Sequence, residues 1–223
     1  PTVGELNQSQ REYVEKVLRG VSQMTNLVDD LLDLGRIEAN VGLERRPCHL
    51  GAILAEAVDS RRARAAAKDI TLRMEPLVRD RTGGNGLADV AMVSGDATLL
   101  RQAITNLVDN AIKYTPEGGK VVVGLSVKHP PRPARAGGRT SDESGRALIR
   151  VSDTGIGIAP EDQVRLFEKF YRIKRRDVRD VSGTGLGLSI VKSIVERHGG
   201  TVSVDSELDE GSTFIISLPL MER

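Results

Sequence analysis

The chain has 223 residues, 39% of them hydrophobic and 28% charged, a composition that excludes a largely disordered or fibrous protein. Its net charge of +1 argues against a general affinity for nucleic acid, and its single cysteine, Cys48, fits a reducing compartment without internal disulfides. Because no apolar run approaches the roughly 20 residues of a membrane span and no signal peptide is evident, we expect a cytoplasmic chain, with a membrane anchor in a longer parent left open.

The first predicted element is one long amphipathic helix over residues 9–38. Its apolar residues recur at alternating steps of three and four, at Val14, Val17, Val21, Met24, Val28 and Leu31. Such a helix has to bury this stripe, either on its own domain or against a partner helix or chain. The heptad-like spacing favours a partner, and the breaks that follow at Asn40, Gly42 and Pro47 indicate a linker.

Mixed helices and strands follow the linker. The predicted helices cover residues 50–68, 97–113 after the N-cap Asp96, a short segment from Pro160, and 186–198. The predicted strands cover residues 70–74, 90–94, 121–127, 147–151, 201–206 and 212–218. Residues 128–145, rich in Pro, Gly and Arg, form a long connection to which we assign no role. This order predicts an α+β fold, an α/β sandwich with a mixed sheet and helices on one face.

One face of the helix over residues 97–113 carries an unusual set of polar residues. Asn106, Asp109, Asn110 and Lys113 fall within about a quarter of the circumference, because each residue advances about 100°. Asparagine is a poor helix former, so a merely solvated face would favour other polar residues. Amide oxygens ligate Mg²⁺, and amide N–H groups and ammonium groups suit phosphate. From residue chemistry alone, a functional face and a solvated face both stay open.

Two glycine-rich segments are candidates for ligand contact. Asp153 to Gly157 follows a predicted strand, where glycine permits close approach of the backbone and the aspartate suits an exocyclic amine such as that of adenine. An ordinary tight turn is the alternative there. Gly183 to Leu188 directly precedes a helix, and successive N–H groups at a helix start suit phosphate. Its Gly-x-Gly-x-Gly spacing matches neither a dinucleotide-binding loop nor a P-loop.

Taken together and in order, these segments resemble the catalytic domain of sensor histidine kinases, the kinases of two-component signalling. The matching segments are Asn106–Tyr114 (N box), Asp153–Gly157 (first glycine box), Phe167–Arg172 (F box) and Gly183–Leu188 (second glycine box). Residues 12–38 are similar to the second helix of the dimerisation and phosphoacceptor hairpin. The resemblance implies a Bergerat-type ATP-binding catalytic domain over residues 47–223, preceded over residues 1–46 by a partial dimerisation and phosphoacceptor region.

The resemblance also implies ATP and Mg²⁺ as cofactors and a role for each matching residue. Asn110 is expected to hold Mg²⁺, and the catalytic groups near the phosphates are expected to be Asn106, Lys113 and Arg172. Tyr114 is expected to pack near the adenine ring and Asp153 to accept from its amine. The further expected nucleotide contacts are Gly155, Gly157, Ile158, Tyr171, Gly183, Thr184, Gly185, Leu186, Gly187 and Leu188. Residues 173–182 are expected to form a lid that orders over the nucleotide.

The implied reaction is transfer of the γ-phosphoryl group to a histidine, and from there to the receiver domain of a response regulator. The family's acceptor lies in a Ser-His-Glu-Leu-Arg-like box, which this sequence does not contain. His49 is expected in the linker, His129 in the long connection, and His198 at a helix end that favours a partly charged imidazole. We therefore expect ATP binding without self-phosphorylation, action in trans on an intact phosphoacceptor domain, and a homodimeric parent kinase.

Two alternatives from other classes stay open. The fold of the resemblance is shared with Hsp90, type II topoisomerase and mismatch-repair ATPases, which activate water with a glutamate where this chain has Asn106. That asparagine and the N-terminal helix favour a kinase. The other alternative is a nucleotide-sensing or dimerisation module without catalysis, against which the intact boxes argue.

Overall fold

The computed structural model describes residues 4, 6–39, 42, 44–75, 78–79, 91–128, 145–173 and 183–221. The helices are α1 (Gln8–Glu38), α2 (Leu50–Asp59), α3 (Arg62–Ala67), α4 (Ala97–Tyr114), α5 (Pro160–Gln163) and α6 (Gly187–Arg197). The strands are β1 (Arg46–His49), β2 (Thr71–Met74), β3 (Val78–Arg79), β4 (Met92–Gly95), β5 (Lys120–Lys128), β6 (Arg146–Asp153), β7 (Thr201–Glu207) and β8 (Gly211–Pro219).

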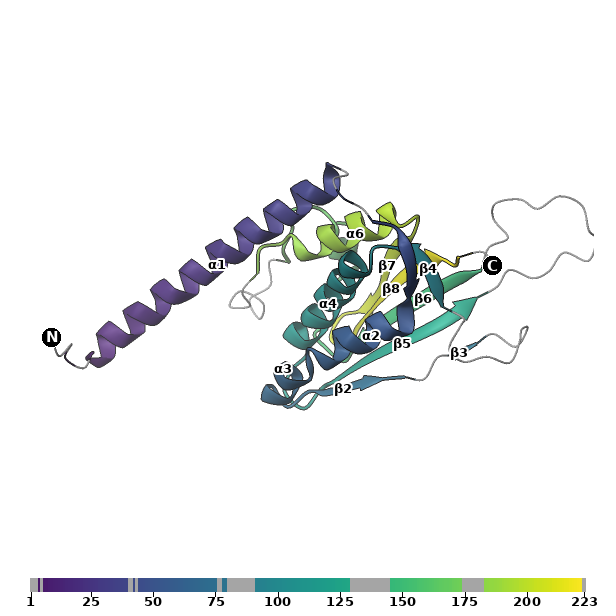
Figure 1. Ribbon diagram of the computed structural model, residues 1–223. Helices are drawn as coiled ribbons and strands as arrows, with labels where there is room; N and C mark the ends of the chain where they lie inside the picture. The colour runs from purple at the N-terminus through teal and green to yellow at the C-terminus, as the bar shows by residue number, and fades with distance from the viewer. Residues whose placement is uncertain are drawn as a thin grey trace, which may run out of the picture.

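The predicted sandwich is confirmed. The main sheet has the order β2-β5-β6-β8-β7, with β3 also pairing with β5. It is mixed, because β2 and β3 run parallel to β5 whereas the other neighbours are antiparallel. Figure 1 shows α2, α4 and α6 together over one face of this sheet. Every second residue along β5 and β6 is buried, as expected for strands with one covered face.

Local sequence signals explain the ends of the central helix, α4. The Asp96 side chain caps it by accepting from the N–H groups of Thr98 and Leu99. At the other end Thr115 turns to extended backbone, and the Lys68 ammonium donates to the carbonyl oxygens of Ile112 and Lys113. These carbonyls have no partner inside the helix, so Lys68 satisfies them with a favourable charge.

The segment predicted as one helix over residues 50–68 is two helices, α2 and α3. They meet at Ser60, whose hydroxyl donates to the carbonyl of Ala57, and at Arg61, whose side chain pairs with Asp109. Hydroxyl groups that bond to a nearby carbonyl compete with continuation of the helix. Two short strands were not predicted. β1 lies in the expected linker and, among the strands that the structure describes, pairs only with β4, an edge position that tolerates Pro47. β3 is two residues long.

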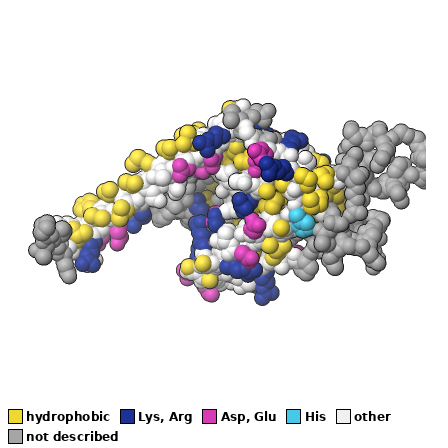
Figure 2. Space-filling view, in the orientation of Figure 1, with side chains coloured by type: hydrophobic (Ala, Val, Ile, Leu, Met, Phe, Trp, Pro, Cys, Tyr) yellow, Lys and Arg dark blue, Asp and Glu magenta, His cyan; other side chains and the backbone are white. Residues whose placement is uncertain are grey.

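The long helix α1 docks at one end and projects at the other. Near its C-terminus Leu34 and Ile37 are buried in the core, and Leu27 packs against it. The N-terminal half stands away from the body, and hydrophobic side chains gather along it in Figure 2. Val14, Val17 and Val21 in this half are exposed, as are Met24 and Val28 further along the helix. Among the described residues, every helix is too short or too polar to span a bilayer.

His198 corrects one sequence expectation. It ends α6 as predicted, but its side chain is buried, and burial lowers the pKa of the imidazole. Nε2 accepts from the Asp96 N–H at 2.9 Å, and Nδ1 lies 2.7 Å from the Ile194 carbonyl oxygen, to which it donates. Both bonds use the neutral ring, so the expected partly charged imidazole at the helix end is wrong, because burial outweighs the helix dipole.

We expect acid to weaken the fold through His198. Its pKa is lower in the folded than in the unfolded chain, so its contribution is present above about pH 6.5 and is lost as the pH falls through the folded-state value. His198→Phe keeps the ring volume but removes the acceptor for the Asp96 N–H. Its cost, measured by urea unfolding, should be about 1–3 kcal/mol at pH 8 and should shrink below pH 6. A cost that does not change with pH would contradict this assignment.

Candidate nucleotide-binding site

A pocket lies between α4, the loop after β6 and the segment before α6. All but two of the residues expected to contact nucleotide line it, and they come from all four motifs. They are Asn106, Asn110, Lys113, Tyr114, Asp153, Gly157, Ile158, Tyr171, Arg172, Gly183, Thr184, Gly185, Gly187 and Leu188. The structure thus brings together residues that are far apart in the chain, from Asn106 to Leu188. Of the expected lid, residues 174–182 lie outside the described residues.

The two exceptions, Gly155 and Leu186, lie behind the pocket wall. The Gly155 N–H donates to Asp153 Oδ1 at 2.9 Å, and a Cβ at Gly155 would stand 2.7 Å from the Tyr114 carbonyl oxygen. Gly155 therefore permits the close approach of two backbone segments that form the wall. Leu186 is fully buried and its carbonyl accepts from Ile190 at the start of α6. Gly155 and Leu186 thus support residues next to them in the chain that line the pocket.

Several lining residues were not expected from the motifs. They are Asp30, Ile156, Leu166, Ser212 and Phe214, whereas Ile173, which also lines the pocket, is the first residue of the expected lid. Ile156 and Leu166 lie inside the first glycine box and beside the F box, so their positions in the chain offered a signal. Ser212 and Phe214 enter because β8 pairs with β6, with Ser212 opposite Asp153. Asp30 belongs to α1, and only the docking of that helix brings it to the pocket.

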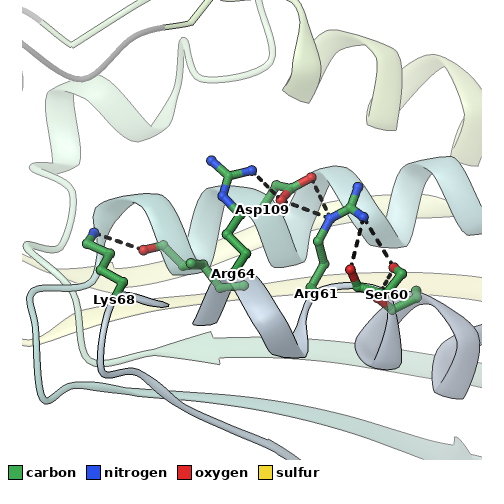
Figure 3. A network of polar contacts seen from close by, with 7 residues as sticks. Ser60, Arg61, Arg64, Lys68 and Asp109 are labelled. Carbon is green, nitrogen blue, oxygen red and sulfur yellow. Dashed lines mark hydrogen bonds and ion pairs between the residues drawn. The ribbon is translucent and has the colours of Figure 1, made fainter. Parts of the chain in front are cut away.

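The polar face of α4 is divided between two tasks. Asn106, Asn110 and Lys113 face the pocket. Asp109 instead accepts from Arg61 Nε at 3.0 Å through both carboxylate oxygens and from Arg64 Nη1 at 2.7 Å (Figure 3). These bonds tie α4 to the start of α3. The sequence grouped the four residues correctly, but Asp109 serves packing rather than the pocket.

Cationic side chains gather in one part of the pocket, where burial disfavours the charged form of Lys113. Burial lowers the pKa of the Lys113 ammonium to about 8, with smaller contributions from the nearby charges of Arg172 and Arg64. The ammonium also lies 4.8 Å from the centre of the Tyr114 ring, within the range of a cation–π contact. A polyanion in the pocket would relieve the repulsion between these cations, so this part of the pocket is suited to phosphate groups.

The pocket also holds a buried carboxylate. Burial raises the pKa of Asp153 to about 6, although backbone N–H groups of Gly155 and Ser212 oppose the rise by donating to it. Near neutral pH Asp153 is mainly ionised and is an acceptor suited to an amine. Apolar side chains of Ile158 and Phe214 lie in the same pocket, which suits the faces of a flat ring.

The oxygen atoms that the pocket offers fit a Mg²⁺ ion that is held mainly by the phosphates of a bound nucleotide. Within the described ranges there is no group of three or more His, Cys, Asp or Glu side chains suited to a metal. Mg²⁺ in phosphate-transfer sites keeps several waters and needs only one or two protein oxygens beside the phosphates. The Asn110 amide faces the pocket and offers such an oxygen. The fold and this pocket together define an ATP-binding catalytic domain.

Comparison with known proteins gives the family. Residues 95–222, more than half of the 223 residues, match the family described as histidine kinase-, DNA gyrase B- and HSP90-like ATPase. Residues 2–40 match the His Kinase A (phospho-acceptor) domain. The chain belongs to the first of these families, as the ATP-binding catalytic domain of a sensor histidine kinase.

The most similar proteins include several sensor kinases. Drug sensory protein A of Synechocystis is 34% identical over 95% of this chain, and sensor-like histidine kinase SenX3 of Mycobacterium bovis is 36% identical over 95%. The chain spans only 30% and 45% of these two proteins. Among solved structures, full-length ShkA in complex with AMPPNP is 28% identical with a TM-score of 0.70, over 99% of this chain and 41% of that one.

Proposed function

We propose that the chain binds Mg-ATP in this pocket and transfers the γ-phosphoryl group to a histidine of a phosphoacceptor domain. A response regulator receiver domain would then accept the phosphoryl group. The observation that carries the proposal is the convergence of Asn106, Asn110 and Lys113 with Asp153 and the start of α6. The AMPPNP complex of ShkA, an ATP analogue complex of a similar chain, supports the same ligand class.

Each side chain has a defined task in this proposal. Asn110 contributes an oxygen to Mg²⁺, whose charge would offset that of the phosphates. Asn106, Lys113 and Arg172 orient the phosphate chain, and the N–H groups at the start of α6 add the positive end of a helix dipole. Asp153 accepts from the adenine amine, with Tyr114 beside the ring. Catalysis then rests on positioning and on charge neutralisation.

The acceptor is proposed to be supplied by another chain. The ring of His198 is buried, and Nδ1 of His49 accepts from the Ala52 N–H to cap α2, while His129 lies outside the described residues. We propose that residues 1–46 are part of a dimerisation and phosphoacceptor region and residues 47–223 the catalytic domain. The parent kinase would be a homodimer, and this sequence would act in trans without phosphorylating itself.

A phosphotransfer assay tests the proposal directly. The chain is incubated with γ-labelled Mg-ATP, alone and with an intact phosphoacceptor domain from a sensor kinase. We expect acid-labile label on the added domain only. Stable phosphohistidine on this chain alone would contradict action in trans. Nucleotide binding without any transfer would favour a sensing module, and steady ATP hydrolysis without an acceptor would favour an ATPase.

The affinity for Mg-ATP should be highest between about pH 6 and about pH 8. Lys113 loses its charge as the pH rises through about 8, and Asp153 loses its charge, and with it most of its strength as an acceptor, as the pH falls through about 6. Calorimetric titrations from pH 5 to 9 measure the loss of affinity on both sides of this range. Lys113→Arg keeps the cation at high pH and should reduce only the loss of affinity above pH 8. The protonation of ATP itself is the same in both experiments, so an unchanged loss of affinity above pH 8 in this variant would exclude Lys113 as its cause.

A further inference from the structure

Helix α1 reaches into the candidate nucleotide pocket. Asp30 lines that pocket, and its Oδ2 accepts from the Thr184 hydroxyl at 2.5 Å. Thr184 belongs to the segment that leads into α6, and its own oxygen accepts from the Leu186 N–H. A carboxylate from the helix that precedes the catalytic domain therefore stands at the loop proposed to face phosphate.

The contact at Asp30 is part of a docked face on α1. Leu27, Asp30, Leu34 and Ile37 follow one another at helical steps of three and four. Leu34 and Ile37 are buried, with exposed fractions of 4% and 3%. Figure 1 shows this end of α1 beside α6, while the rest of the helix projects away.

Two further polar contacts fasten the same end. Asp33 accepts from Gln102 Nε2 of α4 at 2.6 Å, and Glu38 pairs with Lys169 at 2.6 Å. Only Asp30 among these three acidic side chains lines the pocket. In the docked state α1 therefore has structural anchors outside the pocket and contributes one negative charge, that of Asp30, inside it.

That charge stands where phosphate groups would come. The pocket gathers Lys113 and Arg172 with the Thr184 hydroxyl, the kinds of group that neutralise and bind an anion. A carboxylate and a phosphate chain that share this small space repel each other, and a partly buried position weakens the screening by water and salt. Occupation of the pocket by phosphate and occupation by Asp30 are thus in conflict.

We propose that docking of α1 through Asp30 and binding of nucleotide phosphates oppose each other, so that ATP loosens α1 from the catalytic domain. The inference rests on the proposed function, because it assumes that the pocket takes ATP. Coupling of this kind is reciprocal: a docked helix lowers the affinity for ATP by the same factor by which ATP weakens docking. The docked arrangement is then a resting state, and ATP favours a catalytic domain that is released to meet its acceptor.

Removal of the charge tests the conflict. Asp30→Asn keeps the shape and an oxygen that accepts from Thr184, whereas Asp29→Asn removes an equal charge from the exposed neighbour. By calorimetry, we expect Asp30→Asn to bind Mg-ATP at least about fivefold more tightly than the wild type, and Asp29→Asn to match the wild type. Equal or weaker binding by Asp30→Asn overturns this inference alone. Absence of binding in every protein overturns the proposed function as well.

A fluorescent reporter tests the release of the helix. The chain has no tryptophan, so a single Leu27→Trp side chain reports its own environment on the docked face. We expect Mg-ATP to shift its emission to longer wavelength as it becomes solvated, while Val21→Trp on the projecting half stays unchanged. Binding of ATP without a shift from Leu27→Trp would overturn the release.

Discussion

Replacement of Asn110 by alanine is expected to abolish the Mg²⁺-dependent part of ATP binding and to lower phosphotransfer on the order of 10²-fold or more. In the proposed site Asn110 supplies the protein oxygen to Mg²⁺, and the described residues offer no cluster of acidic side chains to replace it. Metal-dependent positioning of the phosphates accounts for much of the rate of phosphoryl transfer. The loss should therefore be larger for transfer than for affinity measured without metal.

The same substitution separates function from stability. Asn110 lies in the interior of α4, where asparagine is a poorer helix former than alanine by roughly 0.5 kcal/mol. Asn110→Ala should thus unfold at an equal or higher urea concentration while it loses Mg-ATP. Titrations with and without Mg²⁺ give the comparison, and Asn110→Asp, which keeps an oxygen ligand, should retain Mg²⁺-dependent binding. Undiminished Mg²⁺-dependent binding by Asn110→Ala would rule out this assignment.

Most of the fold could be predicted because its signals are local. The apolar period of α4 and the cap at Asp96 mark that helix, and short apolar runs rich in valine and isoleucine mark β5 and β6. The errors occur where tertiary contacts decide. β1 exists only because it pairs with β4, and the break at Ser60 depends on Arg61 reaching Asp109.

The residues of the pocket also fall into two groups, those that sequence motifs predict and those that only tertiary contacts bring in. Motif residues such as Asp153 and Lys113 were predicted because the four motifs together, in their order, resemble those of a known family, although each motif alone left an ordinary structural role open. Ser212 carries no such signal, and it enters the pocket only through the register that places it opposite Asp153. Asp30 lies on a heptad-patterned helix where an acidic residue is ordinary, so nothing in the sequence distinguished it from Asp29. The ionisation of His198 was mispredicted because its burial depends on Gly95 and Asp96 more than a hundred positions earlier.

Gly157→Ala should strongly destabilise the fold beside the pocket. Gly157 has φ of +61°, a conformation that side chains with Cβ rarely adopt. A Cβ there would also stand 1.9 Å from the carbonyl oxygen of Glu207, which is backbone and cannot rotate away. The Asp209 N–H donates to the Ile156 carbonyl at 2.8 Å beside it, so the two loops are held together. Strain and overlap together should cost about 2–4 kcal/mol.

Urea unfolding with parallel ATP titration measures this effect and its consequence. Gly157 lines the pocket, so separation of the two loops should weaken Mg-ATP binding even where the variant remains folded. Gly124→Ala is the matched control, because its Cβ would meet only the flexible end of Glu75 at 3.4 Å, in the middle of β5. Alanine there should leave stability unchanged or raise it by about 0.5–1 kcal/mol. Equal unfolding midpoints for the two variants would show that the loop after β6 yields easily, and that the pocket wall does not depend on its contact with Glu207.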